Sequence, residues 1–360
     1  MPILDQGYQH WNGVLTGHAW RWLAISRQGI RAQLRNRTVR YVMLSAWIPA
    51  LVLGAFLVIW GLFEQKSSLL TPFLMLTQNL PEELKAGPRG YRSIFWTIAF
   101  GLFFEVQTFL AMILVLQVGP DLISQDLRTN ATPLYFSRPV RRIDYFIGKL
   151  GVIASFLSMA TVLPAFVAYG LGVCFSLDPG VLPDTARILA ASVAFGLIIV
   201  VSAGPLMLAI SSLSKNSRYV SALWLALWIV GNLASATLIE TIRRPWCPLI
   251  SYTGNLARVR EALLGTDDAW VRVTRLFEAG RDGVRQATNL GPPFGRRPRG
   301  FPFPPPPSTF ESTTDSEKKD EAPLDPLKPP WTWSAGILLS LTALSFVILS
   351  LRVRSLDRVR

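Results

Sequence analysis

Six long apolar blocks constrain the possible fold of this chain more than any other feature of its sequence. They are residues 42–63, 94–118, 150–175, 186–213, 219–241 and 331–351. Each is about as long as the roughly 20 apolar residues that a helix needs to cross the hydrocarbon core of a bilayer. Inside a bilayer a segment must satisfy its own backbone hydrogen bonds, so each block is predicted to be helical. We therefore predict an all-α integral membrane protein with six transmembrane helices.

The composition agrees with this class. Half of the residues are hydrophobic and only 16% are charged, which is a low charged fraction for a soluble globular protein. The first apolar block begins at residue 42, beyond the usual position of a cleavable signal, so we expect the first span to insert as an uncleaved anchor.

The basic residues gather in short segments between the blocks. These segments are residues 1–41 with six Arg and one Asp, 120–149 with five basic residues, 214–218 with Lys215 and Arg218, and 352–360 with four Arg. Short loops rich in Lys and Arg remain in the cytoplasm. We therefore expect both termini to be cytoplasmic, and topology rather than a nucleic-acid partner explains the net charge of +13.

The segment between the fifth and sixth blocks is long and falls on the outer side in this topology. Residues 243–330 carry 14 basic and 11 acidic residues, but long segments are largely exempt from the charge rule. Within it, residues 243–290 are expected to form amphipathic helices on the outer membrane interface. Their apolar faces would carry Leu256, Val259 and Leu263 in one helix, and Trp270, Val273 and Phe277 in the next. Residues 291–330 are rich in proline and charge, and a disordered linker is expected.

The sequence shows no catalytic or nucleotide-binding motif. "IGKL" contains Gly148 and Lys149 but lacks the hydroxyl residue and the first glycine of a phosphate loop. The two histidines lie in the N-terminal segment, away from other metal ligands. We therefore predict a chain that is not an enzyme and binds no metal or cofactor. Cys174 and Cys247 could form one bridge or be two unrelated buried thiols, both near the outer face.

The loop 120–149 is a compact basic segment between two apolar blocks. "DLISQDLRTNATPLYF" can form a short helix that leaves the membrane, and "SRPVRR" ends it because Pro139 disfavours helix at the residue before it. "RIDYFIGKL" then begins the third span. Two interpretations are open. The segment could only anchor the topology and attract anionic lipid, or it could be a docking element for a soluble partner.

The run "LISQDLRTNATPLYFSRPVRRIDYFIGKL" resembles the loop between the second and third spans of the ABC transporter type-two permeases, the membrane subunits of ATP-driven exporters. The family pattern runs from an acidic helix through small residues to a Ser-x-Pro-x-x-Arg turn and ends in Gly-Lys. The resemblance extends to six spans with both ends inside, to a longer outer segment before the last span, and to an interfacial helix within residues 1–41. The length of residues 243–330 departs from the family.

The resemblance implies a half-transporter in a bacterial inner membrane. Two such permease chains, alike or different, would pair, and two separate ATPase chains carrying ATP and magnesium would dock beneath them. Within spans one to five, residues 42–242, loop 120–149 would hold the family's coupling helix. The residues expected to receive the ATPase are Gln125, Asp126, Arg128, Tyr135, Arg138, Pro139, Arg141 and Arg142. The substrate is not indicated.

Two other interpretations compete with this one. A membrane-anchored scaffold would use the spans only to hold a partner-binding segment, and a secondary transporter would be expected to show two similar halves or several charges within the membrane. The chain shows no internal repeat, and Glu105 is the only charge deep in a span.

Two polar residues within the spans are candidates for function. A charged side chain in a bilayer is costly and usually faces a bundle or an aqueous path. Glu105 is therefore expected to face the transport path or the subunit interface, or else to be protonated and hydrogen-bonded to a neighbouring helix. Gly101, one turn earlier, could admit a close neighbour. Asn232 in the fifth span is a weaker candidate that could equally hold helices together.

Overall fold

The computed structural model describes residues 20–65, 88–131, 141–176, 178–276 and 328–355. Helices dominate these ranges, and no strand occurs within them. Six helical stretches are long and apolar enough to cross a membrane: residues 37–62, 90–128, 143–176, 181–213, 217–242 and 331–352. The predicted all-α class and the six predicted spans are thereby confirmed, with boundaries that differ by a few residues.

Several of the spans are built from more than one helix. In chain order the spans are α2 (Arg37–Ser45) with α3 (Ile48–Gln65), α5 (Pro88–Val118) with the short α6 (Asp121–Arg128), α8 (Arg142–Ser176), α9 (Val181–Leu213), α10 (Ser217–Leu225) with the π-helical η3 (Ala226–Val230) and α11 (Gly231–Ile242), and α14 (Trp331–Ser355). Pro164 and Pro205 lie inside α8 and α9 without ending them, as the tolerance of membrane helices for proline allows.

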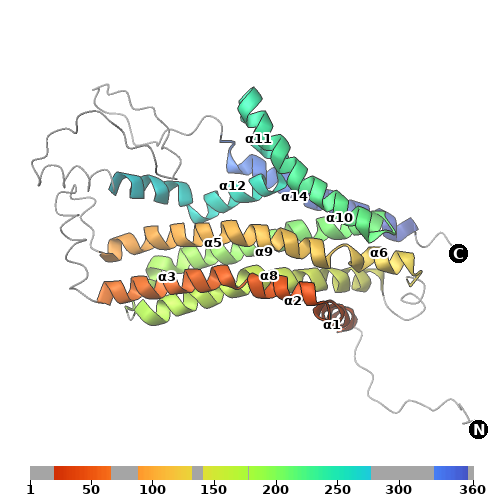
Figure 1. Ribbon diagram of the computed structural model, residues 1–360, viewed down its shortest axis with the longest axis horizontal. Coiled ribbons are helices and arrows are strands. Elements are labelled where there is room, and N and C mark those ends of the chain that lie inside the picture. The colour runs from red at the N-terminus through yellow and green to blue at the C-terminus, as the bar shows by residue number, and fades with distance from the viewer. Residues whose placement is uncertain (1–19, 66–87, 132–140, 177, 277–327, 356–360) are drawn as a thin grey trace, which may run out of the picture.

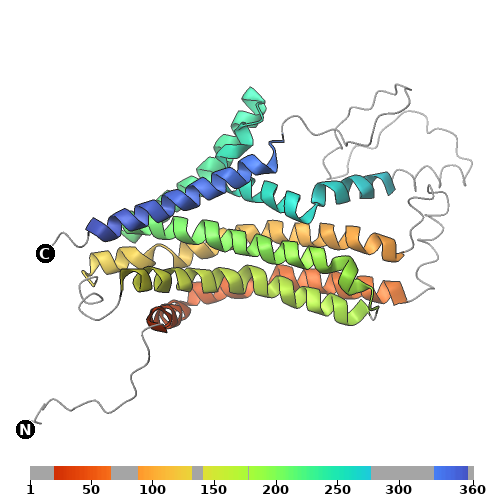
Figure 2. The ribbon, with the colours of Figure 1, turned by 180° about the vertical axis from the view of Figure 1, so that it is seen from behind.

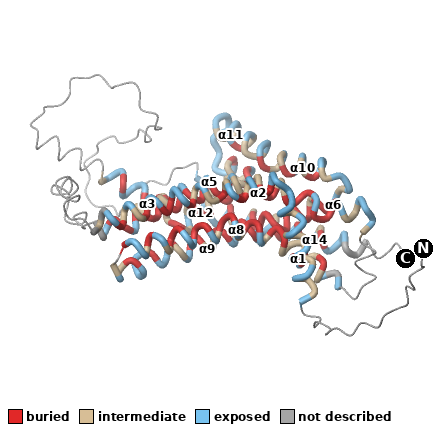
Figure 3. Tube along the Cα trace, turned by 60° about the horizontal axis from the view of Figure 1, so that its bottom comes forward, coloured by how far each residue is buried: buried red, intermediate tan, exposed pale blue. Residues whose placement is uncertain are grey.

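Four helices, α3, α5, α8 and α9, lie side by side and form what we call the four-helix body (Figure 1). Its core contains a chain of aromatic rings, in which Phe104 meets both Phe103 and Phe195 edge to face at 4.8 and 5.2 Å between ring centroids. Buried positions run along the inner faces of these helices (Figure 3).

The helices α10 to α11, α12 (Tyr252–Leu264) and α14 form a second layer on one side of this body (Figures 1 and 2). This second layer is packed far less completely. Within the chain, 61% of the most apolar window of the second span and 67% of that of the fourth are buried, against 17% for the fifth span and 22% for the sixth. Most of the surface of the fifth and sixth spans is thus free to meet lipid or another chain.

The helix α1 (Arg21–Leu34) crosses the spans instead of running along them, and Figure 1 shows it almost end-on. It packs on α8, where the Ser26 hydroxyl donates to the Gly148 carbonyl oxygen at 2.8 Å. A Cβ at Gly148 would lie 2.8 Å from Ile25 side-chain atoms, so a small residue is needed at this crossing. Arg27 and Arg31 are exposed. The predicted helix ahead of the first span is therefore present.

The two ends of the bundle differ in their contents. The helix α1, the helix α6, the start of α10 and the C-terminal end of α14 gather at one end, which we call the α6 end (Figures 1 and 2). At the opposite end, Arg92 of α5 has a side chain only 1% exposed and pairs with Glu64 of α3 at 2.7 Å. Asp178 and Asp184 lie 2.9 and 3.5 Å from the same guanidinium group. This cluster joins the ends of the first four spans.

The segment after the fifth span departs from its predicted position. The chain turns back at Arg243, whose φ is 50°, and the Ser235 hydroxyl donates to the Cys247 carbonyl oxygen at 3.1 Å. The following helix, α12, packs against α5, α9 and α14 instead of lying apart on the interface. Its predicted apolar face is real, since Leu256 and Val259 are buried, but its partners are helices of the same chain.

Because α12 begins beside the middle of the fifth span, we call it the re-entrant helix. A further helical stretch, residues 266–276, follows it. There Val273 is buried against Tyr91, Ile94 and Ile98, whereas Trp270 is exposed. Phe277 and the predicted linker up to residue 327 lie outside the described residues.

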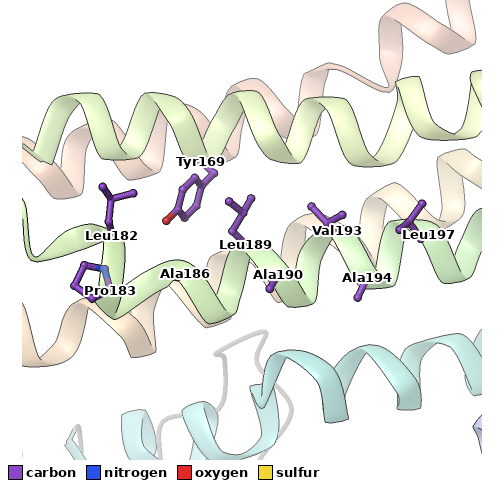
Figure 4. Close-up of a pocket in the computed structure, with 9 residues that line it drawn as sticks. All are labelled: Tyr169, Leu182, Pro183, Ala186, Leu189, Ala190, Val193, Ala194 and Leu197. Carbon is purple, nitrogen blue, oxygen red and sulfur yellow. The ribbon is translucent and has the colours of Figure 1, made fainter.

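Two smaller features complete the fold. Both cysteines are free: Cys247 is buried as expected, but Cys174 is exposed, so the expectation of two buried thiols is wrong for Cys174. An apolar groove runs along α9, and both small and branched side chains of this helix line it (Figure 4). Its lining residues are Tyr169, Leu182, Pro183, Ala186, Leu189, Ala190, Val193, Ala194 and Leu197. The only polar side chain there, Tyr169, has its hydroxyl 3.0 Å from that of Thr185.

Candidate functional site

The short helix α6 continues the second span after a break at Gly119 and Pro120. A Cβ at Gly119 would collide with the side chain of Met207, so α5 and α9 touch at this point. Leu122 and Ile123 are buried at 4% exposure each. One face of α6 is thereby fixed to the body, while Gln125 and Arg128 are exposed.

A serine of α9 caps the first turn of α6. The backbone amides of Ile123 and Ser124 donate to the Ser211 hydroxyl oxygen at 3.2 and 3.1 Å. The same hydroxyl donates to the Pro120 carbonyl oxygen at 2.8 Å. Amides in the first turn of a helix lack partners within it, so Ser211 does from another helix what a local cap residue usually does.

Asp126 binds α6 to the start of the third span. Its carboxylate accepts a hydrogen bond from the Tyr145 hydroxyl at 2.7 Å and lies 2.6 Å from the Lys149 ammonium nitrogen. Both ion-pair partners are largely buried, with side chains 14% and 12% exposed. Charge-assisted bonds in such a setting are stronger than those at an open surface. Asp126 therefore points into the protein and links α6 to the third span.

The fifth span begins in contact with α6. The Asn216 side chain caps α10 by accepting from the Arg218 amide at 3.1 Å. The next residue, Ser217, donates its hydroxyl to the Asp121 carboxylate and lies 3.2 Å from the Ser124 hydroxyl. A displacement of α6 would therefore act directly on the third, fourth and fifth spans. We call α6 with these three attachments the α6 elbow.

The remaining residues of the predicted docking set are only partly described. Arg141 is exposed, and its backbone amide donates to Asp144 at 3.2 Å. Tyr135, Arg138 and Pro139 lie outside the described residues, as does the side chain of Arg142. Of the predicted set, Gln125, Arg128 and Arg141 thus present exposed side chains at this end, whereas Asp126 is turned inward.

Glu105 lies far from the α6 elbow, next to the re-entrant helix. Its side chain is 67% exposed, and its carboxylate lies 3.9 Å from the guanidinium group of Arg260. No hydrogen bond joins Glu105 to a neighbouring helix among the described residues. One turn earlier, a Cβ at Gly101 would lie 2.8 Å from Thr266. The close neighbour expected at Gly101 is therefore the chain just after α12.

Asn232 holds the start of the re-entrant helix. Its side-chain oxygen accepts from the hydroxyls of Ser251 and Thr253, the second at 2.7 Å. Ser251 in turn caps α12 by accepting from the Gly254 amide at 2.8 Å. These contacts match the interpretation of Asn232 as a residue that holds helices together.

Several residues that matter for the structure were missed in the sequence. Arg92 and Arg260 are buried cations, and each meets carboxylates far away in the chain. Ser211 caps a helix 87 residues away. Such contacts leave no local pattern. Within the described ranges, no group of three or more His, Cys, Asp or Glu side chains is placed to hold a metal ion.

Neither a protein-family model nor a curated protein matches this chain in sequence.

Proposed function

We propose that the chain is the membrane-spanning subunit of an ATP-driven exporter, which works in a pair and receives a separate ATPase chain at the α6 elbow. The α6 elbow is the observation that carries this proposal. A coupling element must be rigid, must reach the spans that move, and must leave a face free for the partner. The α6 elbow has largely buried attachments to the third and fourth spans, an exposed attachment to the fifth span, and an exposed face at Gln125 and Arg128.

The attachments of the α6 elbow give a route for mechanical coupling. A displacement of α6 would be transmitted to the third span through Asp126 and Lys149, whose charged atoms lie 2.6 Å apart. It reaches the fourth span through Ser211 and the fifth span through Ser217. In an ATP-driven exporter, closure of the ATPase on ATP would move these spans together and switch the opening of the path between paired permeases.

The charge at the α6 end suits such a partner. Arg128, Arg141, Lys215 and Arg218 are exposed there, and basic residues in short loops favour the cytoplasmic side, where ATP is available. The energy source would be external, because the chain has no phosphate loop. The lightly packed fifth and sixth spans, 17% and 22% buried in their apolar windows, leave room for a second permease chain.

Copurification tests this proposal. The tagged chain is extracted gently from its native membrane, and its partners are identified by mass spectrometry. We expect a stoichiometric chain that contains a phosphate loop. Reversing the charges of Arg138, Arg141 and Arg142 together should release this chain while membrane insertion is kept, and reversing Arg243 and Arg244 at the other end of the fifth span should not. Absence of any ATPase, in an extraction that preserves known transporter complexes, would refute the proposal and favour a scaffold.

A further inference from the structure

Glu105 presents a carboxylate on an apolar surface in the middle of the second span. Its side chain is 67% exposed. Around it on α5, Leu102, Val106 and Phe109 are also exposed, at 52%, 50% and 54%. A carboxylate facing hydrocarbon is costly, and such residues usually face a partner or a path. Within the described residues the chain leaves Glu105 largely uncovered, so a molecule from outside these residues can reach it.

The cation next to Glu105 is hidden. Arg260 of the re-entrant helix is 8% exposed, and its Nη2 atom lies 3.9 Å from the Glu105 Oε2 atom. Its Nε atom is buried without a hydrogen-bond partner in the described part of the chain. A distance of 3.9 Å allows charge attraction but is too long for a hydrogen bond. Arg260 therefore sits behind the carboxylate as a fixed positive charge, and a ligand that approaches from outside meets Glu105 first.

Two sets of contacts fix Arg260 at this depth. At the start of α12, Asn232 accepts from the hydroxyls of Ser251 and Thr253. After its end, Thr266 lies against Gly101, where no Cβ would fit without a shift. The position of Arg260 behind Glu105 is thus set by both ends of the re-entrant helix.

The carboxylate keeps its full capacity to accept hydrogen bonds, which is about four, because the described residues donate none to it. Phe109 lies one helical turn further along α5 and packs against Trp228 at a steep angle, with 5.3 Å between ring centroids. An exposed aromatic side chain next to a carboxylate favours a cation, since the face of such a ring attracts positive charge. The exposed Leu102 and Val106 suit an apolar body attached to that cation.

We propose that Glu105, together with Leu102, Val106 and Phe109, binds the positively charged group of a cationic amphiphile, and that such molecules are the substrate class of this protein. This inference rests on the proposed function, because it places the four residues on the path between paired permeases. The chemistry that is recognised is a protonated amine or another organic cation carried on an apolar body.

The test uses two lipophilic ions of nearly the same shape and opposite charge. The purified full-length chain, in nanodiscs of neutral lipid, is dialysed to equilibrium against tetraphenylphosphonium or tetraphenylborate. We expect saturable binding of the phosphonium beyond its partition into empty nanodiscs, and none of the borate. Glu105→Gln should weaken phosphonium binding about tenfold or more, as loss of a charged contact does. Glu240→Gln, which changes an exposed carboxylate on α11, should bind as the unaltered chain does. Arg260→Gln removes a positive charge 3.9 Å from the Glu105 carboxylate, so it should bind the phosphonium at least as tightly as the unaltered chain.

Three outcomes would overturn the inference. If Glu105→Gln binds the phosphonium as tightly as the unaltered chain does, the carboxylate is not part of the binding site. Preference for the borate, with loss in Arg260→Gln, would show an anion site. The third outcome is that neither ion binds saturably and that the purified protein changes from a dimer to a monomer in Glu105→Gln. This result would assign Glu105 to the contact between chains. The comparison of the two ions on the unaltered chain does not depend on any variant folding.

The assay contains no ATPase, so its result is independent of the copurification experiment. If an ATPase copurifies but the phosphonium does not bind, the inference fails and the proposed function stands. If the phosphonium binds but no ATPase copurifies, the site stands and the proposed function fails.

Discussion

The four-helix body and the second layer are held together by different means. In the body, the apolar windows of the second and fourth spans are 61% and 67% buried within the chain, and a buried cluster around Arg92 joins four spans at one end. In the second layer, the corresponding values for the fifth and sixth spans are 17% and 22%. The second and fourth spans thus bury most of their apolar windows within the chain, whereas the second layer leaves surface that lipid or another chain must cover.

The α6 elbow lies where these two regions meet. Ser211 in the body caps it, and Ser217 at the start of the second layer donates its hydroxyl to the Asp121 side chain. A partner bound to α6 would therefore move both regions together. The difference in packing predicts that changes in the body reduce stability more than changes in the second layer. Two pairs of substitutions compare the regions directly, and two further experiments examine the α6 elbow and the second layer separately.

The largest effect is expected at Arg92. Arg92→Gln would leave Glu64, 5% exposed, without its cation. Breaking a buried ion pair by removing one partner costs about 3–5 kcal/mol. Thermal unfolding of the purified chain in detergent measures the loss. Arg258→Gln is the matched change in the second layer, where the partner Asp267 is 45% exposed, and it should cost much less. Equal losses would contradict the comparison.

The next effect is expected in the α6 elbow. Asp126→Ala removes the acceptor of the Tyr145 hydroxyl and the partner of Lys149. A hydrogen bond to a charged group contributes about 1.5–3 kcal/mol. The Tyr145 and Lys149 contacts share one carboxylate and are not additive, so we expect a total loss of about 3 kcal/mol and weaker association of the ATPase chain. Gln125→Ala, at an exposed neighbouring position, should leave stability unchanged. Unaltered stability of Asp126→Ala would show that α6 is held by its serine contacts alone.

Glycine substitutions give a finer comparison of packing. At Gly61 of α3, a Cβ would lie 2.9 Å from the Phe175 carbonyl oxygen, a backbone atom that cannot move cheaply. Gly61→Ala should destabilise the body by about 1–3 kcal/mol, as overpacking does. At Gly336 of α14, a Cβ would meet nothing within 4 Å, so Gly336→Ala should cost nothing. The measurement is thermal unfolding of both variants under the same conditions. A loss at Gly336 would instead reveal a close partner of the sixth span.

The smallest effect is expected from acid. Partial burial acts to raise the pKa of the Asp267 carboxyl group, but hydrogen bonds from Arg258 and Lys328 outweigh it and hold that pKa below its ordinary value. A lowered pKa means that the stabilisation is present above the unfolded pKa of about 3.9 and is lost as the pH falls through the folded pKa. Because Asp267 is 45% exposed, the contribution is at most about 1 kcal/mol. Asp267→Asn should lower the unfolding temperature slightly at pH 7, and the difference should shrink toward pH 3. A constant difference would exclude this titration.

The spans could be predicted from the sequence because hydropathy is a local sum over neighbouring residues. The short helix after the second span could be predicted from its polar start and from Pro139 beyond its end. The helix before the first span was expected from the family resemblance, but its transverse orientation was not. In the candidate site, the exposed positions of Gln125, Arg128 and Arg141 follow from a basic segment at the end of a span.

The position of the re-entrant helix could not be predicted in this way. An apolar face at helical spacing is the same pattern whether it meets a membrane interface or other helices. The position of the re-entrant helix is set by the chain reversal at Arg243 and by the hydrogen bonds that Ser251 and Thr253 donate to Asn232. The inward orientation of Asp126 could not be predicted for a related reason. Its partner Lys149 lies 23 positions further along the sequence, and only the fold brings the two together.

Site-directed photo-crosslinking at the α6 elbow tests the central claim most directly. A photoreactive residue is placed at Gln125 on the exposed face of α6, and in a second variant at Thr274, which is exposed in the helical stretch 266–276. After illumination of native membranes, we expect an adduct with a chain that contains a phosphate loop from Gln125 and not from Thr274. No such adduct at Gln125, or equal adducts at both positions, would contradict the assignment of α6 as the site that receives an ATPase.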